Sequence, residues 1–232
     1  MTGAQPAEAR PDDRGDEPDG GVAYREHVRL TEALRRVIEA NAYVGAQAAG
    51  TLGGLIDDVD ALADRLEALR ATDREAPRNA RDLIFTDPGR AMAGNPIVGH
   101  LNPIAPSIDM SLLDGEVRGR ARLGLAYVGP PGRVHGGWVC GLLDQLLGFA
   151  CVAAGHPGFT ASITVQLREA TPLDTELDLV GLVTNVSGRR ITAWGAIHAG
   201  GVLTAEAEGL FIAIPPEFMA SEHDYASPEA TN

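Results

Sequence analysis

The sequence predicts an α+β fold in which an antiparallel sheet wraps one long helix, with a helical extension before this core. Three observations predict it. Apolar side chains recur at helical spacing over residues 24–69, and they alternate at the period of strands over residues 108–127 and 159–214. Between the two strand regions, residues 135–154 form a nearly continuous apolar helix. One long helix followed by a meander of strands is typical of a sheet that packs around that helix.

The N-terminal part is expected to be helical but separate from the core. Residues 1–20 are rich in Pro, Gly and Asp and are predicted to be a disordered acidic tail. Residues 21–94 are predicted to contain two amphipathic helices, with a break at the glycines within residues 50–54, and then a connecting segment. The two helices either pack on the core or at an oligomer interface, or they form a lid over a ligand channel.

Residues 95–216 are predicted to form the core domain. A strand at Ile108–Leu112 and a second strand at Val117–Tyr127 flank the hairpin signal Asp114-Gly115. The apolar helix follows at about His135–Ala154. Four more strands are predicted at Phe159–Arg168, Glu176–Val186, Arg190–His198 and Val202–Ile214, and residues 217–232 are a flexible tail.

Composition excludes several functions. The formal net charge is −13, which argues against nucleic acid as a partner, and most of that charge lies outside the core domain. All 19 basic residues are arginine, so Schiff-base chemistry and a phosphate-loop lysine are excluded. The two cysteines, Cys140 and Cys151, match no zinc motif and are too far apart on one helix to bridge. With no signal-peptide pattern and no membrane insertion expected, the predicted location is cytoplasmic.

The predicted core helix contains a lone carboxylate, Asp144, among leucines. Burying an ionised carboxylate costs several kcal/mol unless it is hydrogen-bonded or paired, so Asp144 is either satisfied at a subunit contact or functional. The helix also begins with Gly136 and Gly137, whose amides lack side-chain cover. Amides at a helix N-terminus carry partial positive charge, which is what an oxyanion hole requires.

These motifs resemble a known family. The segments VHGGWVCGLLDQLLG, FTASITVQL, ATPLDTELDL and TAEAEGLF are similar to the hotdog-fold acyl-CoA thioesterases of the phenylacetate-pathway (PaaI-like) type, over about residues 95–214. The resemblance implies that the Gly136 amide binds the thioester carbonyl, that Asp144 is the nucleophile or general base, and that Thr160 holds this acid or its water. His135 is expected to orient the start of the helix rather than act as a base.

The sequence departs from the family pattern at three positions. Some relatives have an Asn as a second carbonyl donor where this chain has Gly129, and Leu167 and Ala170 replace a usual aromatic residue and a frequent proline. These departures affect the pocket rather than the fold. Candidate substrate-binding residues, the arginines of which could equally be solvated surface residues, are Gly137, Trp138, Arg133, Arg168, Arg189 and Arg190.

The predicted function is hydrolysis of an acyl-CoA thioester, with coenzyme A as part of the substrate and with no other cofactor or metal. A hotdog hydratase would need a histidine at position 149, where this chain has Phe149. A protein that binds acyl-CoA without turnover is the alternative. Gly136 and Asp144 lie about 12 Å apart along one helix, so the resemblance and this spacing predict an active site that is shared between the two subunits of a homodimer. Two such dimers could pair into a homotetramer, a dimer of dimers.

Overall fold

The computed structural model describes residues 20–48, 50–69, 88–113 and 115–215. The two predicted tails, apart from Gly20, lie outside the described residues, as do Asp114 and most of the connecting segment.

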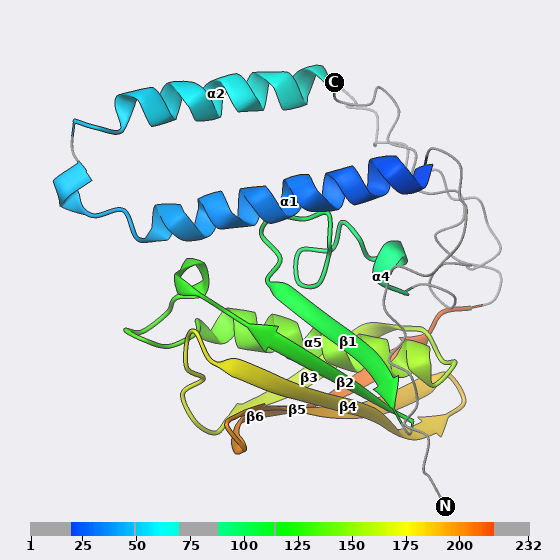
Figure 1. Cartoon of the computed structure of the whole chain (residues 1–232). Coiled ribbons are helices and arrows are strands. Elements are labelled where there is room, and N and C mark those ends of the chain that lie inside the picture. Colours follow the sequence, from blue (N-terminus) through cyan, green and yellow to red (C-terminus); the bar gives the residue numbers. More distant parts are fainter. Residues whose placement is uncertain (1–19, 49, 70–87, 114, 216–232) are drawn as a thin grey trace, which may run out of the picture.

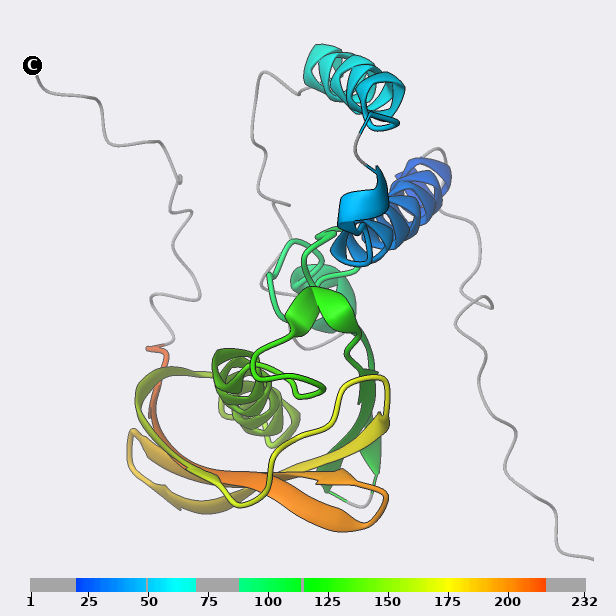
Figure 2. The same ribbon diagram turned by 90° about the vertical axis from the view of Figure 1, so that its left-hand side faces the viewer.

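Within the described residues, six antiparallel strands form one sheet in the order β1-β2-β4-β5-β6-β3. The helix α5 (Gly136–Ala153) lies in the hollow of this curved sheet, as Figure 2 shows from the side. A sheet wrapped around one helix confirms the predicted fold class. The strands are β1 (Ser107–Leu113), β2 (Glu116–Arg122), β3 (Gly158–Leu167), β4 (Glu176–Ser187), β5 (Arg190–Ala199) and β6 (Val202–Ala213).

Two paired glycines allow α5 to approach the sheet closely. Gly181 on β4 lies opposite Gly195 on β5, and a Cβ at either position would press on the side chain of Leu146. Leu146 and Leu147 are fully buried there. By length and composition α5 could cross a membrane, but its leucines are buried against the sheet, so it is the core helix of this domain.

The N-terminal extension contains α1 (Gly20–Ala42), a short 3₁₀ helix η1 (Ala46–Ala48) and α2 (Gly53–Ala68), and a single helical turn, α4 (Pro88–Ala91), precedes the core. Figure 1 shows that α1 lies against the loops of the core, whereas α2 runs beside α1 without packing on the sheet. The two predicted helices are confirmed, but Gly53 and Gly54 belong to the first turn of α2 rather than to the break.

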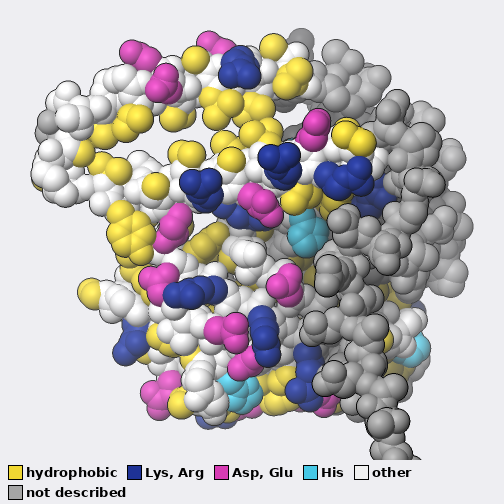
Figure 3. Space-filling model, viewed as in Figure 1, with side chains coloured by type: hydrophobic (Ala, Val, Ile, Leu, Met, Phe, Trp, Pro, Cys, Tyr) yellow, Lys and Arg dark blue, Asp and Glu magenta, His cyan; other side chains and the backbone are white. Residues whose placement is uncertain are grey.

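Apolar side chains of the extension are largely exposed. On α2, Leu55, Ile56 and Val59 are each more than half exposed. Hydrophobic side chains line the sides of α1 and α2 that face each other across open space in Figure 3. The described chain by itself therefore gives α2 little stabilisation from burial.

The predicted strand Val117–Tyr127 is wrong at its C-terminal end. The strand stops at Arg122, and Leu125–Tyr127 form a second 3₁₀ helix, η2. The amides of Leu125 and Ala126 donate to the carboxylate of Glu39 instead of to a neighbouring strand. A long-range side-chain contact thus holds Leu125 and Ala126 outside the sheet, and residue alternation could not reveal this contact.

Candidate active site

The first turn of α5 presents one free amide. His135 is the N-cap residue, and its Nδ1 accepts a hydrogen bond from the Gly137 N–H at 3.0 Å. His135 therefore orients the helix start, and the Gly137 amide is already engaged. In the described part of the chain no atom accepts the Gly136 N–H, so this amide is the one available to bind an oxygen from outside.

The loop before α5 explains why the second carbonyl donor is missing. Gly129 donates to the carbonyl of Arg133, and Gly132 has φ 72°, which together make a tight turn. A Cβ at Gly129 would overlap the backbone of His135. An asparagine therefore cannot occupy this position in the observed backbone, and the Gly136 amide remains the candidate donor.

Asp144 and Thr160 are in direct contact. The Thr160 hydroxyl donates to Oδ1 of Asp144 at 3.0 Å, and Asp144 is half-buried rather than fully buried. The hydrogen bond and the partial exposure both reduce the desolvation cost that the sequence implied. In the part of the chain that the structure describes, no hydrogen bond to the second carboxylate oxygen, Oδ2, is formed.

A β-bulge turns Thr160 toward the helix. On β3, Ile163 lies opposite Gly209 of β6, and Thr160 lies opposite the buried Phe211, with Ala161 as an extra residue between Thr160 and Ser162. Residues directly opposite each other in a sheet point to the same face. Thr160 therefore points inward, although strict alternation from Ile163 would have turned it outward.

Gly136, Cys140 and Asp144 share one face of α5 because they are spaced by four residues. This face is turned toward β3, since Asp144 contacts Thr160 and a Cβ at Gly136 would lie 3.5 Å from Leu167. Leu167 is 56% exposed and forms a wall beside the free amide. The strand β3 is an edge strand, so this side of the site is open.

Trp138 is part of the support of the helix start. Its ring packs edge-on against Tyr127 with the ring centroids 4.9 Å apart, and the Tyr127 carbonyl accepts the N–H of His135. The pKa of the Tyr127 hydroxyl is raised, chiefly by burial, because the lowering effect of Arg35 and the raising effect of Glu39 are smaller. Trp138 thus packs behind the turn that presents the Gly136 amide.

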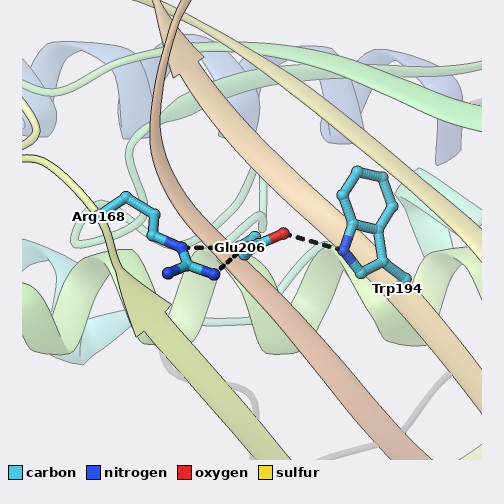
Figure 4. A network of polar contacts seen from close by, with 3 residues as sticks. All are labelled: Arg168, Trp194 and Glu206. Carbon is cyan, nitrogen blue, oxygen red and sulfur yellow. Dashed lines mark hydrogen bonds and ion pairs between the residues drawn. The ribbon is translucent and has the colours of Figure 1, made fainter.

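Arg168 is already paired. Figure 4 shows its guanidinium group directed at Glu206, with hydrogen bonds of 2.9 and 2.6 Å, while Glu206 also accepts from Trp194 Nε1 at 3.3 Å. The Arg168 hydrogen bond, followed by that of Trp194, lowers the pKa of Glu206. Arg168 therefore has less capacity for a phosphate than the sequence suggested.

The other candidate arginines lie at two ends of the site. Arg133 is exposed in the loop before α5, close to the free amide in sequence. Arg189 and Arg190 are exposed at the turn between β4 and β5. This turn lies near the start of β3, because the Arg189 carbonyl accepts a hydrogen bond from the Ala213 amide and Ala213 pairs with Gly158, the first residue of β3. A single chain does not bring these three arginines together.

The sequence analysis missed two functional candidates, Arg35 and Glu39 of α1. Both reach the loops next to the site. They are spaced by four residues and therefore share one helix face, but nothing in the sequence indicates that this face contacts the core; the structure places it there, with the buried Thr31 on the same face. Among the described residues, no cluster of three or more His, Cys, Asp or Glu side chains could hold a metal ion.

Comparison with known proteins identifies the family of the chain. A crystal structure of a thioesterase superfamily protein is 33% identical to this chain with a TM-score of 0.72, and the match covers 80% of this chain and 90% of that protein. The chain belongs to the thioesterase superfamily, and its core has the hotdog fold. No family model matches the sequence.

Two further relatives match over shorter stretches. The acyl-coenzyme A thioesterase THEM4 of Xenopus laevis is 31% identical over 90 residues, which are 38% of this chain and 40% of that protein. This chain therefore spans less than half the length of that relative. A hypothetical thioesterase from Streptococcus pneumoniae, crystallised with coenzyme A, is 20% identical to this chain with a TM-score of 0.44, and the match covers 46% of this chain and 88% of that protein.

Proposed function

We propose that the protein hydrolyses the thioester of an acyl-CoA to a free acid and coenzyme A, with residues 95–216 as the catalytic domain. One observation carries the proposal. The helix that offers the free Gly136 amide also carries Asp144, and Asp144 is hydrogen-bonded to Thr160 of β3. A carboxylate held by a hydroxyl and an unoccupied amide are the two groups that acyl transfer from a thioester requires. The match to an acyl-coenzyme A thioesterase supports acyl-CoA as the substrate.

In the proposed mechanism, the thioester carbonyl oxygen accepts a hydrogen bond from the Gly136 amide. Asp144 then either attacks the carbonyl carbon or removes a proton from an attacking water. With Asp144 as the nucleophile, the C–S bond breaks as a mixed anhydride of the acyl group and Asp144 forms, and coenzyme A leaves as the thiolate; a water then hydrolyses the anhydride to the free acid and the Asp144 carboxylate and supplies the proton that the thiolate takes up. With Asp144 as the general base, the water adds to the carbonyl carbon, the C–S bond breaks, and the proton that Asp144 removed from the water passes to the leaving thiolate. Thr160 holds Asp144 in position, and His135 keeps the first turn of α5 in place. Arg133, together with Arg189 and Arg190, is proposed to contact the phosphates of coenzyme A.

The two groups must come from different subunits. Eight residues along a helix correspond to about 12 Å, whereas reacting atoms must approach to about 3–3.5 Å. A second α5, antiparallel across a two-fold axis, brings its Asp144 beside the Gly136 amide and creates two equal sites. The edge strand β3, which forms the open side of the site and whose Phe159 and Leu167 are each 56% exposed, is the surface on which a second copy is proposed to pair.

The general activity is tested with a panel of acyl-CoAs and a dye that traps released thiol. Thiol release with any member identifies hydrolysis. Ligand-dependent thermal stabilisation without thiol release would instead identify a protein that binds acyl-CoA without turnover. A panel with neither response would refute the substrate class.

Complementation tests the shared site. Asp144→Asn keeps the Gly136 amide, whereas Gly136→Pro removes it. Proline is tolerated at the first position of a helix, and His135 already has the extended backbone (φ −61°, ψ 131°) that a residue before proline requires. Each variant should be inactive by itself. When the two are unfolded together and refolded at equal concentration, activity should recover to about a quarter of wild type, because half of the dimers are mixed and each has one good site. Mixed dimers without turnover would contradict the shared site.

Thr160 is tested as a holding residue. Thr160→Ser keeps the donor to Asp144, and Thr160→Val keeps the shape but removes the hydroxyl. We expect Ser to keep much of kcat and Val to lose most of it, because the hydrogen bond orients the carboxylate. Equal rates for the two variants would remove Thr160 from the mechanism.

A further inference from the structure

The extension is joined to the core by two charged side chains one turn apart on α1. The guanidinium group of Arg35 donates to three carbonyls of one loop: Ala105 at 2.9 Å, Gly99 at 2.7 Å and Asn102 at 3.1 Å. Three charge-assisted hydrogen bonds from one rigid group fix both the position and the orientation of that loop relative to α1.

Glu39 holds the N-terminus of η2. Its Oε1 accepts from the Leu125 amide at 2.8 Å and its Oε2 from the Ala126 amide at 3.1 Å. Gly124 has ordinary backbone angles, but a Cβ there would overlap the Glu39 carboxylate. A side chain at position 124 would therefore displace the Glu39 carboxylate from the two amides that it binds.

The residue that ends η2 touches the turn that presents the Gly136 amide. The Tyr127 carbonyl accepts the N–H of His135 at 2.9 Å, its ring packs edge-on against Trp138, and its hydroxyl donates to the Ile104 carbonyl at 3.3 Å. Ile104 belongs to the loop that Arg35 holds. Both contacts of α1 thus converge on Tyr127, and Tyr127 contacts the residues on each side of Gly136 and Gly137.

We propose that Arg35 and Glu39 are positioning residues that set where the Gly136 amide points, so that α1 is part of the catalytic apparatus and not a lid. This inference rests on the proposed hydrolysis. The extension acts through η2 and Tyr127 on the first turn of α5, while α2 takes no part in this chain of contacts. A displacement of the first turn changes the stabilisation of the transition state more than the binding of coenzyme A, because the amide contacts the reacting oxygen.

The kinetic test compares three variants. Glu39→Gln leaves a single acceptor oxygen for two amides, and Gly124→Ala leaves Glu39 unchanged but displaces its carboxylate. Glu32→Gln, at an exposed position seven residues earlier on α1, is the matched control. We expect kcat to fall about ten- to a hundredfold in the first two variants, with KM within about twofold and with the control unchanged. Unchanged kcat in both folded variants would overturn the proposal.

A spectroscopic readout separates this proposal from the proposed function. The chain has two tryptophans, so Trp194→Phe leaves Trp138 beside Tyr127 as the one fluorophore of its kind. In this background, Glu39→Gln and Gly124→Ala should shift the Trp138 emission and Glu32→Gln should not. If wild type releases no thiol but the shift occurs, hydrolysis is refuted while the coupling stands. Emission that is unchanged in both folded variants would refute the coupling itself.

Discussion

Cys140 gives the most direct physical test of the shared site. It lies midway between Gly136 and Asp144 on the same face of α5. If the Asp144 of one copy lies beside the Gly136 of the other, the two-fold axis passes next to position 140, and the two Cys140 side chains face each other. For packed helices with axes about 8–10 Å apart and Cα atoms about 2.3 Å from each axis, the facing Cα atoms are about 3.4–5.4 Å apart, and at the wider helix separations this distance is within disulfide range.

The assay is covalent dimer formation in the folded protein. A mild oxidant or a short bifunctional maleimide should convert most of the chains to a covalent dimer on a denaturing gel, and Cys140→Ser should abolish it. Cys151 is an internal control. Its side chain is 0% exposed, and burial raises the pKa of its thiol to about 11. It should therefore react only after unfolding. The cross-linked dimer should hydrolyse no substrate, since the link crosses the space between the two sites.

The refuting result is equally specific. If the protein is dimeric by light scattering and Cys140 accepts a monofunctional maleimide, yet no cross-link forms under any oxidising condition, the antiparallel arrangement of the two helices is wrong. The complementation experiment would then have to fail as well, because both rest on the same register.

The remaining predictions concern Asp144, the buried core and the ion pair between Arg168 and Glu206. Asp144→Asn keeps an oxygen for Thr160 but removes the charge, so kcat should fall about 10²–10⁴-fold with Tm unchanged or raised; a variant that unfolds yet retains specific activity would give Asp144 a structural role. Leu146→Ala, fully buried, should lower the free energy of unfolding by about 2–5 kcal/mol, whereas Leu55→Ala, 60% exposed, should cost about 0.5 kcal/mol or less; equal losses in urea titrations would mean that α2 is covered in solution. Because the pKa of Glu206 is lowered in the folded state, its contribution to stability is present above the ordinary glutamate value of about 4.3 and is lost as the pH falls through the lowered folded value. The Tm difference between wild type and Glu206→Gln should therefore shrink at low pH, and a constant difference from pH 7 to pH 3 would contradict the ion pair.

Most of the fold could be predicted from the sequence because the elements follow local rules. The helix at residues 135–154 and the four strands after it agree with the observed bounds to within a residue or so, since each has a clear period and a turn signal at its ends. The strand predicted to reach Tyr127 failed because Glu39, far away in sequence, takes its amides. Nothing near Leu125 in the sequence indicates that partner.

The sequence by itself determined which chemical groups the candidate site contains. It contains a carboxylate in an apolar helix, two glycines at the start of that helix and a threonine at the start of the next strand. Local spacing alone places Gly136 and Asp144 on one face about 12 Å apart, and with this spacing the proposed mechanism requires a second copy.

Only the tertiary structure decided which of these groups meet. Strict alternation places Thr160 on the outer face with Ser162 and Thr164, and the bulge at Ala161 turns it inward to Asp144. The side chain of His135 takes the Gly137 amide and leaves that of Gly136 free. The position of a β-bulge depends on how two strands pair, and a cap depends on which side chain lies near the helix end. The period of a single strand or helix does not specify these neighbours; the tertiary structure does.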